Sequence, residues 1–416
     1  MARESSGSYD IIVVGAGPGG SSCAALLGRK GYNVLLLDKA KFPREKTCGD
    51  AVSGKSLRVL RDLGIDKEIE KMPHASIRGV IFSSPKGVQL DIPFRGKPLP
   101  GEKEPGYCCK REIMDNLFFT CAKKTKGVTT MENFQVSDII LEGEQVVGVK
   151  GVDMNAKQER EFRANVIVGA DGAQSVIARK TGCVTVPDPR HSCAAVRAYY
   201  TGVSGPKDRI ELHFIDEVLP GYFWIFPVSE TEHNIGLGML TKDMQGKSIN
   251  LKQIMLDAIE KNALFKERFK NAKPSTEIRG WTLPLGSKRQ KAHGAGYVLI
   301  GDAASLIDPF TGEGVGNATT SAKIACDAID KAFKANNFSA NMLSVYAENL
   351  WAELGPEMQT SYNLQRAGKW KFLLNLVIGK AARKPEIREF IGGTFTNKEA
   401  KKQLYSPMFY FKLLFA

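Results

Sequence analysis

Residues 9–40, YDIIVVGAGPGGSSCAALLGRKGYNVLLLDKA, constrain the fold of this chain more than any other stretch. They are typical of a strand, a tight glycine turn, a helix and a second strand. Residues 11–14 form the continuous β-branched run expected of a buried parallel strand. Residues 21–30 are predicted to form a helix that ends at Gly31. This order indicates the first βαβ unit of a parallel sheet with a ligand at its glycine turn.

Three glycines of this unit, Gly15, Gly17 and Gly20, fill a G-x-G-x-x-G pattern. The first makes the turn, the second lets a pyrophosphate approach the backbone, and the third lets helix and strand pack closely. Asp38 ends the second strand, where it is expected to accept hydrogen bonds from a ribose. The unit therefore predicts a dinucleotide site, although the pattern alone does not separate FAD from NAD.

Two later stretches favour FAD. Residues 164–182 contain a strand, Asp171 and Gly172, and then a helix, while residues 294–329 contain a strand, GDAA, a glycine-rich loop and a long helix. Asp302 of GDAA can hold a ribityl hydroxyl, and N–H groups at the start of the long helix can stabilise negative charge on a reduced flavin. Taken singly, Asp171 fits a turn residue and GDAA a helix N-cap.

Length and composition are those of an ordinary globular protein, with 416 residues, 43% of them hydrophobic, which is enough for two or three domains. The start, MARESSGSYD, has no apolar run, and no segment offers about 18 uninterrupted apolar residues. We therefore expect a cytoplasmic protein without a signal peptide or spanning helix. The eight cysteines show no CxxC pattern, which predicts reduced thiols and no metal site.

The formal net charge of +13 is concentrated at the C-terminus, where residues 361–416 carry eleven Lys or Arg and three Glu. Two apolar clusters lie in this basic stretch, at 371–380 and 407–416. Basic charge beside large apolar side chains predicts peripheral attachment to an anionic membrane surface. The alternative is a helical subdomain that packs its apolar residues inward. Nucleic acid is not an expected partner, because the stretch contains no recognisable nucleic-acid module.

Residues 222–239 are predicted to form a β-hairpin around the polar break at 229–232. In the first strand, period-two alternation places three aromatic side chains on one face: Tyr222, Trp224 and Phe226. Phe223 and Ile225 share the other face, and Pro227 ends the strand. Gly236 and Gly238 of the return strand permit close approach of a ligand or ring. The aromatic face fits either a core strand or the lining of an apolar site.

The G-x-G-x-x-G, G-A-D-G and G-D-A-A-x-x-x-D-P stretches together resemble the para-hydroxybenzoate hydroxylase-type flavoproteins over most of residues 9–330. The resemblance implies that Arg111 holds the cofactor phosphate or ribityl region, that Asp171 lies near the pyrophosphate, and that Gly314 and Val315 contact the flavin ring. The full set of expected FAD-binding residues is Gly15, Gly17, Gly20, Asp38, Lys39, Arg44, Cys48, Gly49, Arg111, Asp171, Gly172, Gly301, Asp302, Gly312, Gly314 and Val315.

The resemblance also implies the architecture, an α/β fold (α+β overall) with a Rossmann-like, discontinuous FAD-binding domain. An antiparallel β-sheet substrate-binding domain is inserted in it. The charge pattern adds a helical, basic C-terminal region that associates with a membrane or packs its apolar residues inward. The expected boundaries are 1–75, 103–189 and 281–335 for the FAD domain, 76–102 and 190–280 for the substrate domain, and 336–416 for the C-terminal region.

A sharper resemblance concerns the hairpin and residues 43–54, PREKTCGDAVSG. Tyr-x-Trp-x-Phe-Pro followed by Gly-x-Gly is similar to the motif of the geranylgeranyl reductases, and Cys48-Gly49-Asp50 resembles the Cys-Gly element beside the flavin in that family. The resemblance implies reduction of C=C bonds in a prenyl chain on a lipid, a diphosphate or a quinone. Hydride would come from flavin N5 and a proton from a nearby group. The expected substrate-binding residues are Tyr222, Trp224, Phe226, Gly236 and Gly238.

The expected catalytic residues are Cys48, Tyr222 and Trp224. An isolated alkene has no carbonyl to polarise, so alignment and exclusion of water must supply most of the catalysis. Cys48 is the first candidate for the proton donor and Tyr222 the second. Trp224 belongs to the aromatic wall, which can also stabilise transient positive charge. Lys46 and Arg44 are candidates for contact with a substrate phosphate, or are surface charges.

The chain contains no second dinucleotide-binding pattern, so the flavin would be reduced by transiently bound NAD(P)H or by a ferredoxin-like carrier protein. Two other activities share the expected fold, those of an FAD monooxygenase and of a halogenase. Halogenases resemble the hairpin with Trp-x-Trp-x-Ile-Pro, from which Tyr222 and Phe226 depart. A non-catalytic, prenyl-lipid-binding flavoprotein is the alternative of another class. The sequence leaves the oligomeric state open.

Overall fold

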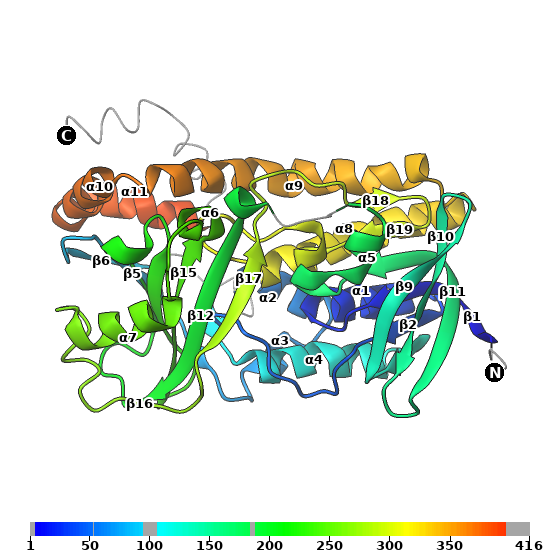
Figure 1. Cartoon of the computed structure of the whole chain (residues 1–416), viewed down its shortest axis with the longest axis horizontal. Helices are drawn as coiled ribbons and strands as arrows, with labels where there is room; N and C mark the ends of the chain where they lie inside the picture. The colour runs from blue at the N-terminus through cyan, green and yellow to red at the C-terminus, as the bar shows by residue number, and fades with distance from the viewer. Residues whose placement is uncertain (1–4, 53, 95–105, 184–187, 397–416) are drawn as a thin grey trace.

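The structure is a computed structural model that describes residues 5–52, 54–94, 106–183 and 188–396. Two large sheets dominate these residues and lie next to each other along the long axis of the molecule (Figure 1). Helices pack around both, and the long helix α9 (Ala340–Ala367) runs along one side from the first sheet towards the far end. The mixed α/β architecture confirms the expected fold class.

The first sheet has the strand order β18-β19-β11-β1-β2-β8, with β10 and β9 continuing from β11. Its central strands are parallel, and residues 11–14 are at most 5% exposed, which explains their unbroken apolar run. Its strands are β1 (Ser5–Val14), β2 (Val34–Leu37), β8 (Val128–Met131), β9 (Phe134–Glu142), β10 (Gln145–Asp153), β11 (Gln158–Gly169), β18 (His293–Gly294) and β19 (Tyr297–Leu299).

The helices around the first sheet include α1, which begins at Pro18. Proline is tolerated there because an N–H group in the first turn has no carbonyl partner within the helix. Gly19 of α1 lies against Ala318 of α8, so these two helices approach closely. The helices before the C-terminal region are α1 (Pro18–Arg29), α2 (Gly54–Asp62), α3 (Asp66–Ile69), α4 (Arg111–Lys124), α5 (Val176–Lys180), α6 (Thr241–Met244), α7 (Leu251–Lys261) and α8 (Val315–Lys334). Short 3-10 turns occupy Gly172–Gln174, Pro189–His191, Asp216–Val218 and Gly301–Ala304.

The second sheet has the order β16-β12-β15-β14-β13-β5-β6, and β17 pairs with β12. β14 and β15 pair antiparallel, which confirms the predicted hairpin. Phe223 and Ile225 are fully buried in the cluster that includes residues of α7, as the alternation predicts. Its strands are β5 (Gly79–Ser83), β6 (Gln89–Pro93), β12 (Ser192–Thr201), β13 (Arg209–His213), β14 (Tyr222–Pro227), β15 (Glu232–Leu240), β16 (Lys273–Pro274) and β17 (Arg279–Pro284).

A third, small sheet contributes side chains to the apolar clusters of both large ones. It consists of β3 (Ala51–Val52), β7 (Tyr107–Cys108) and β4 (Ala75–Ser76) in the order β3-β7-β4. β3 directly follows the Cys48-Gly49-Asp50 stretch, so the pairing of β3 with β7 holds one end of that loop. The expected domain boundaries stay predictions, although both large sheets do combine strands from separate parts of the chain.

The C-terminal helices pack partly inward. After α9 come α10 (Lys371–Arg383) and α11 (Pro385–Thr396), and both contact β6. Ile378 and Ala381 of α10 are buried in the apolar cluster of the second sheet. Trp370 and Phe372, in contrast, are 71% and 73% exposed. The apolar cluster predicted at 407–416 lies outside the described residues. None of the described helices is long and apolar enough to cross a membrane.

Charged residues are buried on the α7 side of the second sheet. Glu211 accepts two hydrogen bonds of 2.7 Å from Arg268 and contacts His213 at 3.1 Å. Next to them lies His233, which is 1% exposed and has no hydrogen-bond partner on either ring nitrogen. Burial, with the positive charge of Arg268 nearby, lowers the pKa of His233 to about 4. Folding therefore keeps this imidazole neutral.

The free energy of unfolding should consequently fall as the pH is lowered from 6.5 towards 4. In that window the unfolded chain binds a proton at His233, whose ordinary pKa is about 6.5, and the folded chain does not. The full effect is about 3 kcal/mol for this residue, of which about 2 kcal/mol falls between pH 7 and pH 5. Urea unfolding at pH 7 and pH 5 measures it, and His233→Leu should flatten the pH dependence. The same slope in wild type and variant would contradict the assignment to His233.

Candidate functional site

A cavity of about 1310 Å³ lies between the two large sheets. One half is lined by the glycine turns and charged residues of the first sheet, and the other by apolar and aromatic residues of the second. The predicted site residues that line it are Gly15, Gly17, Asp38, Lys39, Arg44, Cys48, Gly49, Arg111, Asp171, Gly172, Tyr222, Trp224, Phe226, Gly301, Asp302, Gly312, Gly314 and Val315. Gly20, Gly236 and Gly238 lie behind the lining. The structure thus brings together segments that are up to 300 residues apart in the sequence.

The glycine turn offers a surface that a ligand can approach. Gly15 has φ +99°, and a Cβ there would lie 2.3 Å from the carbonyl oxygen of Ala170. A Cβ at Gly20 would lie 1.8 Å from the carbonyl oxygen of Gly15, so this glycine lets α1 pack on β1. A Cβ at Gly17 would meet only Arg44 Nη2, at 3.6 Å. The open side of Gly17, at the start of α1, therefore fits a pyrophosphate.

Asp38 is fixed at the edge of this turn. Its carboxylate oxygens accept hydrogen bonds from the backbone N–H groups of Ala16, at 2.7 Å, and Ala40, at 2.8 Å. Each carboxylate oxygen has a second lone pair, so the group can still accept from a ribose hydroxyl. This position agrees with the role expected for Asp38.

Two arginines are held in the cavity by a carboxylate that the sequence reading missed. Asp115 is fully buried and accepts bonds from Arg111 Nε at 2.5 Å and Nη2 at 2.8 Å, while Arg44 Nη1 lies 2.8 Å from it. Arg111 and Asp115 are four residues apart on α4, a spacing at which opposite charges meet. That spacing was the available signal. Arg44 is therefore a cavity residue, not a freely solvated surface charge.

Asp171 has a structural task as well as a place in the lining. Its side chain accepts hydrogen bonds from Ser175 Oγ at 2.5 Å and from the backbone N–H of Val176 at 2.6 Å, at the start of α5. Burial raises the pKa of Asp171, and these hydrogen bonds oppose the rise. The turn interpretation and the cofactor-site interpretation are thus compatible at this residue.

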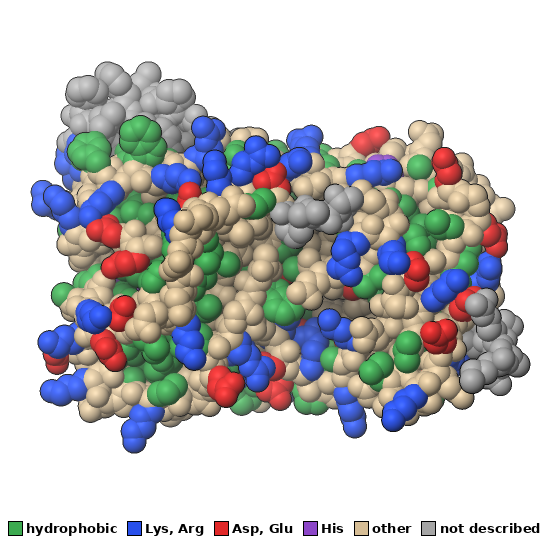
Figure 2. All heavy atoms as spheres, in the orientation of Figure 1, with side chains coloured by type: hydrophobic (Ala, Val, Ile, Leu, Met, Phe, Trp, Pro, Cys, Tyr) green, Lys and Arg blue, Asp and Glu red, His purple; other side chains and the backbone are tan. Residues whose placement is uncertain are grey.

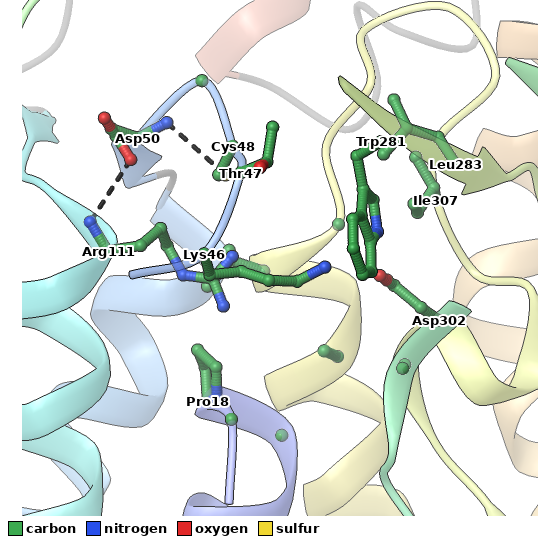
Figure 3. A pocket seen from close by; sticks show the side chains of 18 of the residues that line it. Pro18, Lys46, Thr47, Cys48, Asp50, Arg111, Trp281, Leu283, Asp302 and Ile307 are labelled. Carbon is green, nitrogen blue, oxygen red and sulfur yellow. Dashed lines mark hydrogen bonds between the residues drawn. The ribbon is translucent and has the colours of Figure 1, made fainter. Parts of the chain in front are cut away.

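At the middle of the cavity, Lys46 extends between Arg111 and Asp302 (Figure 3). Its ammonium lies 3.6 Å from the ring centroid of Trp281, a cavity residue that the sequence reading did not identify. Burial lowers the pKa of Lys46 to about 8, while Asp302 opposes that shift and Arg111 adds to it. Lys46 was expected at a substrate phosphate or on the surface, and the structure places its side chain inside the cavity.

The start of α8 completes the charged half. Gly312 has φ +73°, Gly314 precedes the helix, and Val315 is its first residue. Asp308 holds this loop by accepting hydrogen bonds from the backbone N–H groups of Phe310 and Thr311. The N–H groups of the first helical turn lack carbonyl partners within the helix, so this end of the cavity favours negative charge.

The aromatic face of the hairpin forms the opposite wall. The hydroxyl of Tyr222 donates to the carbonyl oxygen of Thr311 at 2.6 Å, which ties the wall to the loop before α8. A Cβ at Gly49 would lie 3.1 Å from the ring of Phe226, so the Cys48-Gly49-Asp50 loop packs directly on this wall. The rest of the apolar lining includes Ile77, Val80, Ile210, Leu212, Leu283 and Ile307.

The two hairpin glycines act indirectly on the cavity. A Cβ at Gly236 would lie 2.3 Å from Trp224 Cζ2, so the missing side chain gives room to the indole. A Cβ at Gly238 would lie 3.2 Å from Cys193 Sγ. The sequence reading allowed for close approach of a ligand or a ring, and at Gly236 the structure provides a ring. Contact of either glycine with a substrate stays a prediction.

Cys48 lies at the boundary between the charged and apolar halves. The backbone N–H of Asp50 points to Cys48 Sγ at 3.4 Å, and the backbone N–H of Arg111 donates to Asp50 Oδ1 at 3.2 Å (Figure 3). Asp50 is fully buried, and burial raises its pKa. Its other partners, Tyr199 and Asn234, carried no signal in the sequence that separated them from ordinary strand residues.

The open side of Gly17 gives a test of the cofactor site. Gly17 has φ −65°, so Gly17→Leu introduces no backbone strain, but its side chain would fill the space that FAD requires. We expect the variant to fold and its affinity for FAD to fall about tenfold or more. A loss of about 1.4 kcal/mol of binding free energy lowers an affinity tenfold. The flavin absorbance of the purified protein and a titration with FAD measure this. Gly20→Ala is the contrasting variant and should lower the melting temperature, because its Cβ would meet the backbone of Gly15. A wild-type FAD content in Gly17→Leu would refute the proposed pyrophosphate site.

Comparison with known proteins supports an FAD-binding role for this part of the chain. The family model described as "FAD binding domain" matches residues 8–335. The digeranylgeranylglycerophospholipid reductase of Methanocaldococcus jannaschii is 31% identical over 84% of each chain. Among solved structures, a geranylgeranyl bacteriochlorophyll reductase-like protein of Thermoplasma acidophilum superposes with a TM-score of 0.81 at 22% identity, covering 96% of this chain and 98% of its own.

The fold is shared more widely. A myxobacterial chondrochloren halogenase superposes with a TM-score of 0.72 at 24% identity, covering 85% of this chain and 81% of its own. This likeness concerns the fold alone. The FAD-binding domain and the reductase relative confirm the expected cofactor and family together: the chain is an FAD-dependent oxidoreductase and belongs to the geranylgeranyl reductase family.

Proposed function

We propose that this oxidoreductase saturates C=C bonds of a prenyl chain carried by a lipid, a diphosphate or a quinone. The observation that carries the proposal is the apolar, aromatic half of the cavity, which meets the Cys48 loop at the Gly49–Phe226 contact. A wall of this kind accepts a flexible hydrocarbon chain, which offers few polar groups for recognition. The relative from Methanocaldococcus jannaschii carries a prenyl lipid in its name, which supports the same substrate class.

The cofactor would be held by residues that line the charged half. Gly17 and the start of α1 fit the pyrophosphate, Asp38 a ribose, Arg111 the phosphate or ribityl region, and the start of α8 the flavin ring. When bound in its reduced form, FAD supplies the hydride for one carbon of the double bond. The electrons come from NAD(P)H or from a carrier protein.

The chain's own residues would orient the substrate, exclude water and deliver the proton. Trp224 and Phe226 are each 8% exposed. They would pack against the alkene and exclude water, so that alignment supplies most of the catalysis. The second alkene carbon needs a proton. The hydroxyl of Tyr222 already donates a hydrogen bond to the carbonyl oxygen of Thr311 at 2.6 Å. Cys48 is therefore favoured as the proton donor.

The proposal predicts anaerobic turnover. We expect the dithionite-reduced holoenzyme to add two hydrogens per double bond to at least one of three substrates: geranylgeranyl diphosphate, a geranylgeranylated phospholipid and a menaquinone. Mass spectrometry of the products measures this. Oxygen consumption coupled to a hydroxylated or halogenated product would instead favour a monooxygenase or halogenase. Binding without any product from all three would favour a non-catalytic prenyl-binding protein.

Replacing the proposed proton donor should slow the reaction. Cys48→Ala is expected to lower kcat about 100-fold, in the range found for loss of a general acid, while FAD stays bound. Single-turnover oxidation of the reduced flavin by substrate measures the rate. Cys121→Ala, a half-buried cysteine of α4 away from the cavity lining, is the matched control and should keep the wild-type rate. A wild-type rate in Cys48→Ala would remove the donor role.

We further propose that the end of the molecule formed by α10 and α11 rests on an anionic membrane surface. Figure 2 shows hydrophobic side chains among lysines and arginines at this end. Trp370 and Phe372 are the most exposed large hydrophobic residues among those described, and Lys369 and Lys371 flank them. Apolar insertion beside basic charge is the usual basis of peripheral attachment.

The double variant Trp370→Ser/Phe372→Ser should bind anionic vesicles about tenfold or more weakly, because it loses two apolar side chains that insert. Co-sedimentation with phosphatidylglycerol vesicles measures this. The matched control is Leu141→Ser/Met154→Ser, two residues that are 55% and 51% exposed and lie in and next to β9 and β10 at the other end of the molecule (Figure 1). An equal loss of vesicle binding in both variants, or no loss in the first, would contradict the proposed membrane-binding surface.

A further inference from the structure

The side-chain amide of Asn234 joins the two halves of the cavity. Asn234 Oδ1 accepts a hydrogen bond of 2.9 Å from the indole Nε1 of Trp224. Its Nδ2 donates to the carbonyl oxygen of Cys48 at 2.6 Å and to Asp50 Oδ2 at 2.7 Å. We infer that Asn234 is a positioning residue that sets the Cys48 loop against the Trp224 wall for the reaction, an inference that rests on the proposed function.

The chemistry of its partners fixes the orientation of this amide. An indole N–H can only donate, so the amide oxygen must face Trp224. A carbonyl and a carboxylate can accept both amide hydrogens, so the nitrogen must face Cys48 and Asp50. Asn234 is fully buried, and both of its amide hydrogens are therefore used inside the protein. No other short side chain offers one acceptor and two donors, and aspartate in its charged form offers no donor.

Asp50 anchors the loop from the other side. Its Oδ2 also accepts a hydrogen bond of 2.6 Å from Tyr199, and its Oδ1 accepts from the backbone of Arg111 at 3.2 Å. The backbone of Asp50 has φ +69°, a left-handed conformation that aspartate adopts more readily than most non-glycine residues and that these hydrogen bonds stabilise here. The loop between Cys48 and β3 is thus held by the second sheet through Tyr199 and Asn234, and by α4 through Arg111.

This arrangement has a consequence for the reaction. Trp224 belongs to β14, Asn234 to the paired strand β15, and Cys48 to a loop of the other half of the cavity. Without the amide, the indole loses its acceptor and the Cys48 carbonyl loses a donor, so each is free to shift. A displacement of about 1 Å at a reacting group can slow a reaction about 10²-fold. The expected effect is therefore on kcat, with KM for the prenyl substrate nearly unchanged.

The test compares three variants of the FAD-loaded protein. Asn234→Ala removes the link, and Asn234→Ser keeps one hydroxyl donor if the alanine variant fails to fold. Asn234→Asp keeps the acceptor for Trp224 but in its charged form has no donor for the Cys48 carbonyl or for Asp50. The matched control is His233→Leu, because His233 is the preceding buried residue of the same strand and faces away from the cavity.

Two readouts separate positioning from general damage. The first is kcat, which should fall about 10²-fold in Asn234→Ala and in Asn234→Asp at unchanged FAD content. The second is the alkylation rate of Cys48 by iodoacetamide, resolved by peptide mass spectrometry. It should rise several-fold in Asn234→Ala, with Cys121 and Cys183 as internal references that do not change.

Wild-type kcat and Cys48 alkylation in both Asn234→Ala and Asn234→Ser would overturn the inference. A wild-type kcat in Asn234→Asp would overturn it as well, because the two bonds from Asn234 Nδ2 to the Cys48 loop would then have no part in positioning. Equal changes in kcat and Cys48 alkylation in His233→Leu would also overturn the inference, because the effect would then come from general damage to β15. If the wild type reduces no prenyl substrate, the proposed function fails, but the alkylation rate of Cys48 still decides whether Asn234 positions Cys48.

Discussion

The contact between the Cys48-Gly49-Asp50 loop and the β14–β15 hairpin is the constraint on which the cavity depends. The loop approaches closely because Gly49 has no side chain to keep Phe226 away, and the amide of Asn234 bonds both the loop and Trp224. These are short-range interactions between two separate sheets. They fix how far apart the charged and apolar halves of the cavity lie, and therefore where a cofactor and a substrate can meet.

The division of the cavity into two halves follows from how each sheet is built. In the first sheet, parallel strands end at glycine turns and helix starts, which present N–H groups and leave room for phosphates. In the second, side chains alternate along each strand, so one face packs on α7 while the other lines the cavity. A polar cofactor and an apolar chain can thus be bound side by side without either half compromising the other.

The buried charges of the cavity and of the second sheet differ in how completely a partner compensates them. Asp115 neutralises Arg111 and Arg44, and Glu211 is paired with Arg268, so these groups hold their surroundings in place. Lys46 lies instead over the Trp281 ring, with its pKa lowered towards 8. A group that is incompletely compensated within the cavity is more typical of a binding site than of a core.

The sequence by itself determined the first βαβ unit, the hairpin, and the glycines and aromatic side chains that line part of the cavity, because glycine spacing and period-two alternation are local properties of the chain. Only the tertiary structure decided that Asp115 also meets Arg44, that Gly236 makes room for Trp224, and that Lys46 extends inside the cavity. It alone revealed Asn234, which is 184 residues from Asp50. The physical reason is that a hydrogen bond between distant segments depends on how two sheets pack, and no local pattern of residues records that packing.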